Sequence, residues 1–375
     1  MRIYIIAGES SGDAHAAGLM RDLLAIRPEV EFFGAGGPKM RAVGGEHLQE
    51  WTQEAVVGLW DVLVKYGYFR AQFYRMYDEI CRLKPDAVVF VDYPGFNLRL
   101  AEYLHRHGFP GKLIYYISPQ VWAWNRSRIP RMAKFLDLMM CIFPFEKPLY
   151  EASGLRTEFV GHPMIEELAD RTLPGSRDPV LIGLFPGSRE REVKRIFPVM
   201  LEAAKLLCHR DAALRFAVAA ASEKLRDLMS KLASEAGFNG LAIGLKNSIE
   251  LMQRSSVGMV ASGTATMESS FFRLPFVLIY KVSWLTYVPG RILIRVDHLG
   301  MPNILAGKQI VPEFIQQDAR PASIADAVWE LYSNPETRRA MIQAMDCVIA
   351  TLDKPGGGKR AARVLVEELE RSHKL

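Results

Sequence analysis

Short apolar segments rich in Val, Ile, Phe and Tyr recur along the first 160 residues and alternate with longer segments of helical periodicity. Each apolar segment has five to seven residues, the length of a buried strand. Strands are therefore predicted at residues 2–7, 87–92, 112–118, 137–143 and 157–161. Strands that alternate with helices in this way predict a parallel sheet with crossover helices.

A second series begins after residues 168–179, LADRTLPGSRDP, which are polar and contain Pro and Gly, so we interpret them as a linker. Its strands are predicted at 180–185, 214–220, 257–263 and 275–281. A chain of 375 residues is also too long for one ordinary core. We expect an α/β protein with two doubly wound, Rossmann-like domains facing a cleft, at residues 1–168 and 169–345, and a final turn and helix at 346–375.

Composition narrows the class of protein. The net charge of +5 fits an anionic substrate, an anionic membrane surface or nucleic acid. No run of 18 apolar residues and no signal peptide is found, so a cytoplasmic location is expected. Four cysteines lie far apart without CxxC spacing, which predicts neither a zinc site nor a disulfide framework.

The first strand leads into the turn GESSGD at residues 8–13. Glu9 and Asp13 bring two carboxylates into a turn that lacks Lys and Arg. These two negative charges would repel a diphosphate. Together with Ser11, they could accept hydrogen bonds from the hydroxyls of a sugar. The alternative is that Ser11 or Asp13 only caps the following helix.

Signals for an anionic ligand lie in the second half of the chain. In LFPGSRE, Ser188 and Arg189 directly follow a strand, and a guanidinium can bind phosphate oxygens in a forked geometry. The alternative there is a helix capped by Ser188.

A second signal is ASGTATME, where Ser262, Gly263 and Thr264 follow a strand that ends at Ala261 and open a helix whose N–H groups suit a diphosphate. Glu268 lies four residues after Thr264 on the same helix face, where it could accept hydrogen bonds from a ribose.

Two further polar residues are candidates for the chemistry. Asp92 stands at the carboxyl end of a predicted strand and is either a general base or a helix cap. Asn303 lies in a Pro-containing turn and is either part of the site or an Asx-turn residue. No DxD, HExxH, GxSxG or paired Cys/His motif occurs, so neither a metal nor another cofactor is expected.

These motifs, together with VDYPGFN, YYISPQVWAW, IFPFEK, FVGHPM and MPNILAG, occur in the order and spacing that resemble lipid A disaccharide synthase, over residues 2 to about 315. The resemblance implies an inverting glycosyltransferase with the glycosyltransferase B fold, acting in the lipopolysaccharide synthesis of Gram-negative outer-membrane biogenesis. It implies UDP-2,3-diacylglucosamine as donor and 2,3-diacylglucosamine 1-phosphate (lipid X) as acceptor. They would be joined β(1→6) with release of UDP.

The resemblance also implies roles for the candidate residues. Asp92 matches the general base, Arg189 and Asn303 match essential residues, and Glu268 matches the acid that binds the UDP ribose. The motif of Glu9, Ser11 and Asp13 matches the acceptor side, so the first domain would bind acceptor and the second UDP-sugar. The chain departs from the family at Gly95, where many members carry a second Asp.

The segment GLWDVLVKYGYFRAQFYRMY combines apolar and aromatic residues at helical spacing with Lys and Arg, which is typical of a helix in a membrane interface. The alternative is a helix that buries the stripe in its own core. The resemblance favours attachment to the cytoplasmic face of the inner membrane through phospholipid contacts of these residues: Leu59, Trp60, Val62, Leu63, Tyr66 and Phe69.

A second basic and aromatic stretch, WAWNRSRIPRMAK, could meet lipid phosphate or stack on RNA bases through Arg126, Arg128, Arg131 and Lys134 beside Trp122 and Trp124.

Two other functions fit parts of the pattern. A UDP-sugar 2-epimerase would share the fold and the UDP helix, and a basic membrane- or RNA-binding protein would need no catalytic residue. Neither explains the motifs of both domains, so we expect the transferase and no nucleic acid partner. The sequence leaves open whether copies of the chain form a homo-oligomer.

Overall fold

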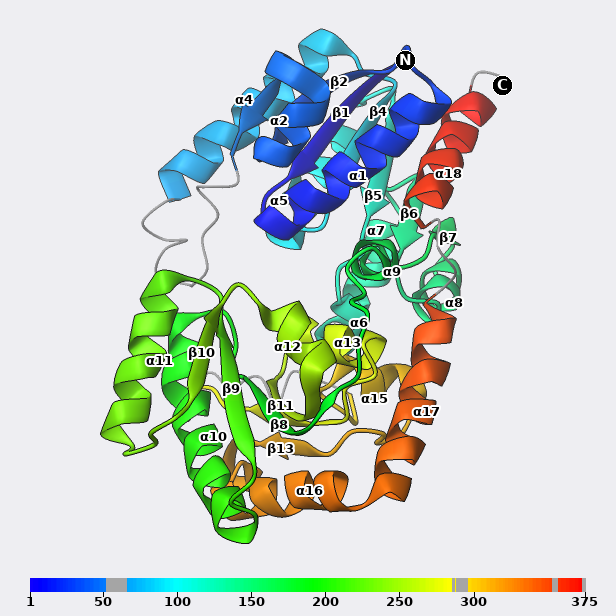
Figure 1. Cartoon of the computed structure of the whole chain (residues 1–375). Helices are drawn as coiled ribbons and strands as arrows, with labels where there is room; N and C mark the ends of the chain where they lie inside the picture. The colour runs from blue at the N-terminus through cyan, green and yellow to red at the C-terminus, as the bar shows by residue number, and fades with distance from the viewer. Residues whose placement is uncertain (52–65, 285–286, 288–295, 353–356, 373–375) are drawn as a thin grey trace. The chain divides into compact units, whose positions relative to one another are not determined.

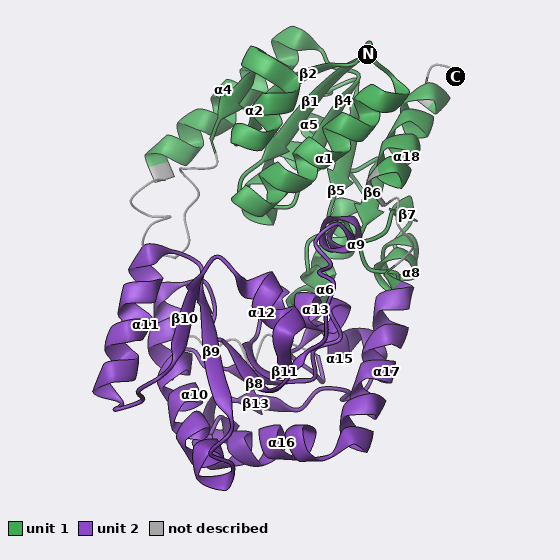
Figure 2. Cartoon of the chain, in the orientation of Figure 1, with its two compact units in different colours: residues 1–163, 352–375 green, residues 164–351 purple. Residues whose placement is uncertain are grey.

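The structure is a computed structural model that describes residues 1–51, 66–284, 287, 296–352 and 357–372. The chain forms two compact units, Met1–Pro163 with Leu352–Leu375, and Met164–Thr351 (Figure 2). The expected division after residue 168 therefore falls five residues earlier, and the C-terminal segment, expected as a separate part, belongs with the first unit. Its helix packs there because an apolar face, including Leu365 and Leu369, is buried.

The first unit contains a parallel sheet of seven strands in the order β3-β2-β1-β4-β5-β6-β7 (Figure 1). Strands β1 and β4 lie at its centre, and apart from the exposed Arg2 all their residues are buried, as expected for parallel strands covered by helices. The strands are β1 (Arg2–Ala7), β2 (Glu31–Gly36), β3 (Leu48–Glu50), β4 (Ala87–Val91), β5 (Lys112–Tyr116), β6 (Leu138–Cys141) and β7 (Thr157–Phe159).

Helices cover both faces of this sheet. One face packs Tyr4 and Ile6 of β1 into a core with Met76, Ile80 and Leu104 of α4 and α5. Helix α18 lies beside α1 (Figure 1). The helices are α1 (Ser10–Ile26), α2 (Pro38–Gly44), α4 (Tyr66–Leu83), α5 (Pro94–Arg106), α6 (Val121–Trp124), α7 (Ile129–Met132), α8 (Glu146–Glu151) and α18 (Gly357–Ser372), with 3-10 turns η1 (Gly45–His47) and η3 (Arg126–Arg128).

The second unit repeats this architecture with six parallel strands in the order β10-β9-β8-β11-β12-β13. The strands are β8 (Asp178–Phe185), β9 (Arg215–Ala220), β10 (Ala242–Leu245), β11 (Ser255–Ala261), β12 (Phe276–Tyr280) and β13 (Glu313–Ile315). Its helices are α9 (Met164–Ala169), α10 (Glu190–Arg210), α11 (Glu223–Glu235), α12 (Ser248–Arg254), α13 (Thr264–Phe271), α15 (Met301–Ala306), α16 (Pro321–Ser333) and α17 (Pro335–Thr351), with the 3-10 turn η4 (Gln316–Asp318).

The stretch interpreted as a linker is fastened to the second unit at Arg177. Its Nη1 donates to the carbonyl oxygens of Met252 at 2.6 Å and Ser255 at 2.7 Å, and its Nη2 donates to that of Phe272. Burial lowers the pKa of this guanidinium to about 10. Although the segment is polar in composition, its half-buried Arg177 therefore anchors it to the second unit.

Among the residues that the structure describes, no helix is both long enough and apolar enough to span a bilayer.

Candidate active site

Two motifs of the first unit meet at the switch point of its sheet. Chain connections run from β1 to β2 in one direction and from β4 to β5 in the other, and β1 and β4 are neighbours. Glu9 follows β1 as the N-cap residue of α1, and Asp92 directly follows β4. Ligands of open α/β sheets bind at this kind of position, because the loops there diverge and leave a crevice.

The backbone at Asp92 is held in a strained conformation. Asp92 and Tyr93 have φ angles of 47° and 49°, in the left-handed region that non-glycine residues rarely adopt. The Asp92 carbonyl accepts hydrogen bonds from Tyr115 Oη at 2.6 Å and Asn97 Nδ2 at 2.8 Å, which stabilise this turn. Gly8 leaves room for the Tyr93 ring, since a Cβ there would lie 2.4 Å from it.

The surroundings of the Asp92 carboxyl group raise its affinity for a proton. The N-cap of α5 is Tyr93, without a side-chain capping bond, so the helix-cap alternative does not describe Asp92. Burial, and second the charge of Glu9, raise the pKa of Asp92 from 3.8 to about 6. At neutral pH the group is ionised yet able to take a proton.

The turn after β1 divides into exposed and buried residues. Glu9 and Ser11 are exposed at the start of α1. Asp13 is only 3% exposed, and its carboxylate accepts backbone N–H bonds from Gly37 at 2.9 Å, Lys39 at 3.0 Å and Met40 at 2.9 Å. The expectation that Asp13 faces a sugar is therefore corrected: Asp13 binds the N-terminus of α2, not that of its own helix.

The second unit contains a pocket of about 400 Å³ at the carboxyl ends of β8, β9, β10 and β11. Its position again matches the switch point, here between β8 and β11. All six residues that the sequence predicts for UDP binding line this pocket: Ser188, Arg189, Ser262, Gly263, Thr264 and Glu268.

Arg189 is fixed at the start of α10. Arg189 is the N-cap residue of α10, so the alternative that Ser188 caps this helix is wrong. Arg189 Nη1 donates to Glu192 Oε1 at 3.0 Å. Gly187 permits this turn because its φ is +105° and a Cβ would lie 2.4 Å from the Glu192 carboxylate. The Arg189 side chain is 65% exposed, so most of its donors face solvent at the pocket.

The opposite wall of the pocket is the start of α13. Gly263 is its N-cap, with a φ of 148°, and Thr264 is the first helical residue. Glu268 lies one turn further in and is half-buried. Burial, then the charge of Glu167, raises the pKa of Glu268, whereas Arg171 lowers it.

The pocket also has residues that sequence reasoning missed. Lys246, in the turn between β10 and α12, and Ser248, the first residue of α12, line it. Lys246 has a φ of 54° and its N–H donates to the Ala220 carbonyl at 2.8 Å. The strand before this turn, β10, is short and partly exposed, so its sequence does not predict a strand or the left-handed turn after it.

Asn303, predicted as a catalytic residue, is completely buried. Its Nδ2 donates to the Val311 carbonyl at 2.8 Å and to Glu313 Oε1 at 2.7 Å. Its Oδ1 accepts from the N–H groups of Ile310 at 2.8 Å and Val311 at 2.9 Å. Every polar atom of this side chain is therefore bound within the protein, and the catalytic role of Asn303 stays a prediction.

Of the six residues predicted for the membrane interface, Leu59, Trp60, Val62 and Leu63 lie outside the described residues, as does the side chain of Tyr66. Phe69 is half-buried, and its ring meets Trp51 edge-on at 6.3 Å. Phe69 thus gives part of its apolar surface to the core of the first unit. In the described part of the chain, no group of three or more His, Cys, Asp or Glu side chains could hold a metal ion.

Two parallel α/β units, the second with a nucleotide-sized pocket at its switch point, define the glycosyltransferase B class. The fold is shared with UDP-GlcNAc 2-epimerase from Neisseria meningitidis (TM-score 0.63, 11% identity, 99% of this chain and 100% of that one). It is also shared with a glycosyltransferase from Rickettsia africae (TM-score 0.53, 11% identity, 99% and 97%).

Sequence similarity gives the family. The family model of lipid-A-disaccharide synthetase matches residues 3–358. The lipid-A-disaccharide synthase of Geobacter sulfurreducens is 40% identical over 380 residues, covering 98% of this chain and 97% of the relative. The chain belongs to the lipid-A-disaccharide synthase family. It is a glycosyltransferase of lipid A disaccharide synthesis, and the family implies a UDP-sugar and an acylated glucosamine phosphate as substrates.

Proposed function

We propose that this enzyme transfers 2,3-diacylglucosamine from UDP to the 6-hydroxyl of 2,3-diacylglucosamine 1-phosphate, with Asp92 as general base. The observation that carries this proposal is the carboxyl group of Asp92 at the switch point of the first unit, with a pKa raised to about 6. A base of that pKa removes a proton efficiently near neutral pH.

The reaction is a single displacement at the anomeric carbon of the donor. Asp92 takes the proton of the acceptor hydroxyl as its oxygen attacks that carbon. The bond between the anomeric carbon and the diphosphate oxygen breaks, and UDP leaves with the bonding electrons. Attack from the opposite side inverts the anomeric centre and gives the β(1→6) linkage.

The donor would bind in the pocket of the second unit. The diphosphate would accept N–H bonds at the start of α13 from Gly263 and Thr264. The Ser262 N–H donates to the Ile279 carbonyl at 3.0 Å, so Ser262 would contribute its hydroxyl. Arg189 and Lys246 would offset its charge and that of the leaving UDP. The half-buried Glu268 would accept hydrogen bonds from the ribose hydroxyls, and burial raises the pKa of its carboxyl group.

The acceptor would bind beside Asp92 in the first unit, where Glu9 and Ser11 are exposed at the start of α1. Asp13 stabilises this turn because its carboxylate accepts hydrogen bonds from the N-terminus of α2.

The diacylated substrates require contact with a bilayer. We propose peripheral attachment to the cytoplasmic face of the inner membrane through the segment around Leu59, Trp60, Val62 and Leu63, whose apolar and basic composition carries this part of the proposal.

The test is disaccharide formation from the two proposed substrates by purified protein in detergent with EDTA. We expect wild type to release UDP and disaccharide in equal amounts, and Asp92→Asn to lose roughly 10² to 10⁴-fold in kcat with little change in KM for the donor. Glu268→Gln should instead raise the donor KM. Absence of product from folded wild type would refute the substrates, and an active Asp92→Asn variant would refute the base.

A further inference from the structure

A second pocket, of about 230 Å³, lies within the first unit and has no role in the functions described above. One wall is a face of α5, starting at its first turn, and the other is formed by η3, α7 and Phe135. We call it the arginine pocket, and its lining residues are Pro94, Gly95, Leu98, Arg99, Glu102, Arg128, Arg131, Met132 and Phe135.

The arginine pocket has an apolar floor and a cationic rim. Leu98, Met132 and Phe135 are buried, with at most 8% exposure. Arg99 and Arg131 are exposed, and Arg128 is half-buried. The lining contains these three guanidinium groups and one carboxylate, that of Glu102, which gives an excess of two positive charges. A phosphate monoester carries close to −2 at neutral pH, so it matches this excess.

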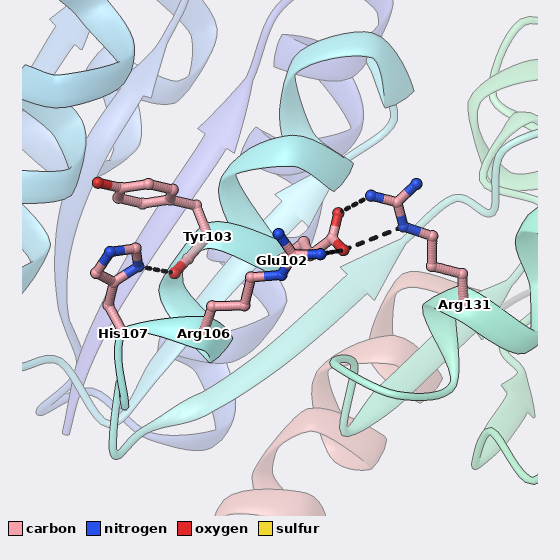
Figure 3. Close-up of polar contacts among 5 residues, drawn as sticks. All are labelled: Glu102, Tyr103, Arg106, His107 and Arg131. Atoms are coloured by element: carbon pink, nitrogen blue, oxygen red, sulfur yellow. Dashed lines mark hydrogen bonds and ion pairs between the residues drawn. The ribbon is translucent and has the colours of Figure 1, made fainter.

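Ion pairing with Glu102 fixes the position of Arg131 in the rim. Arg131 donates to Glu102 from Nε at 3.1 Å and from Nη2 at 2.5 Å, which leaves Nη1 outside the pair (Figure 3). Arg106 approaches the same carboxylate from within α5, at 2.7 Å. These guanidinium groups, that of Arg131 first, lower the pKa of Glu102 and keep it ionised.

The opposite wall is also built rigidly. The Arg128 guanidinium lies 4.8 Å from the centre of the Trp124 ring, a cation–π contact that orients it. Trp122 in the same helix donates from Nε1 to the buried Glu146 carboxylate at 2.9 Å. The pocket is therefore preorganised for an anion.

The position of the pocket relates it to the reaction. Pro94 and Gly95 line it, and they follow Asp92 at the start of α5. A volume of about 230 Å³ is below that of sites for whole drug-sized ligands, so it suits a headgroup fragment.

We propose that the arginine pocket binds the phosphate monoester of the acceptor sugar and so selects a phosphorylated acceptor beside Asp92. This inference rests on the proposed function for the identity of the acceptor. A phosphate monoester in the headgroup of a membrane lipid would also fit the arginine pocket. The experiment below distinguishes this lipid from the acceptor sugar.

The test measures binding without turnover. Glucosamine 1-phosphate and glucosamine are titrated into the full chain by NMR, with saturating UDP to occupy the pocket of the second unit. We expect wild type to prefer the phosphorylated sugar at least tenfold, and the double variant Arg99→Gln, Arg128→Gln to lose that preference. The matched control is Arg106→Gln, which removes a guanidinium from the same Glu102 outside the pocket lining.

Three outcomes overturn the proposal: no preference in wild type, equal loss in Arg106→Gln, or a double variant that keeps the preference. If that double variant keeps the preference but loses binding to phosphatidic acid vesicles, the occupant is the phosphate monoester of a lipid headgroup. Wild type that shows the preference but forms no disaccharide leaves the pocket assignment standing and refutes the proposed function.

Discussion

Asp92 should make the folded enzyme less stable at neutral pH than it would be with a neutral side chain. Its pKa of about 6 lies above the ordinary value of 3.8, so the folded protein binds the proton more tightly than the unfolded chain does. The contribution of this carboxyl to stability is therefore fully present below about pH 4 and is lost as the pH rises through about 6.

The substitution Asp92→Asn removes the ionisation and keeps the shape. At about 1.4 kcal/mol for each pH unit, the rise from 3.8 to about 6 corresponds to about 3 kcal/mol. Glu9 is exposed and its charge is screened by solvent, so we expect a gain of about 1 to 3 kcal/mol at pH 7.5. The gain should shrink to near zero at about pH 4.

The assay is urea unfolding at about pH 4.5, 6 and 7.5, followed by hydrogen–deuterium exchange in peptides of β1 and β4, which reports on the first unit alone. Asp78→Asn is the control, because Asp78 is an exposed carboxylate on α4 of the same unit. A gain in Asp92→Asn that does not change with pH would refute the reasoning, and so would a loss of stability at pH 7.5.

Three further predictions concern single residues. Glu9→Gln removes a charge that raises the pKa of Asp92, so the acidic limb of the kcat/KM profile should move to lower pH; an unmoved limb would contradict this coupling. Arg177→Met leaves the carbonyls of Met252, Ser255 and Phe272 without their donor, and urea unfolding should show a loss of about 2 to 4 kcal/mol in the second unit. Asn303→Leu removes four hydrogen bonds and should cost about 3 to 5 kcal/mol of unfolding free energy; an inactive variant of full stability would instead indicate direct chemistry.

The central strands could be predicted from the sequence because they are buried on both faces. The apolar segments at 2–7 and 87–92 correspond to β1 and β4, and the segment at 180–185 to most of β8. Short edge strands such as β3, β10 and β13 were not predicted. They are three or four residues long and partly exposed, so their pairing depends on the neighbouring strand more than on their own composition.

The residues predicted for UDP binding line one pocket of the second unit because they directly follow strands. In parallel sheets, loops at the carboxyl ends of the strands come together, so the motifs at Arg189 and Thr264 line the same pocket. The roles of Asp13 and Asn303 were not predictable in this way. The Asp13 carboxylate and the Asn303 amide bind backbone N–H groups, those of Gly37 and Val311 among them. Only the folded chain determines where these backbone groups lie.

The sequence by itself therefore determined the fold class, the family and the strand ends that carry polar residues, because these depend on local periodicity and on motif order. Only the tertiary structure decided which polar side chains bind backbone groups and which face a pocket. It also decided that the C-terminal helix belongs to the first unit and that three arginines line one pocket with Glu102. The physical reason is that hydrogen bonding and desolvation of a side chain depend on residues distant in sequence, which no local pattern specifies.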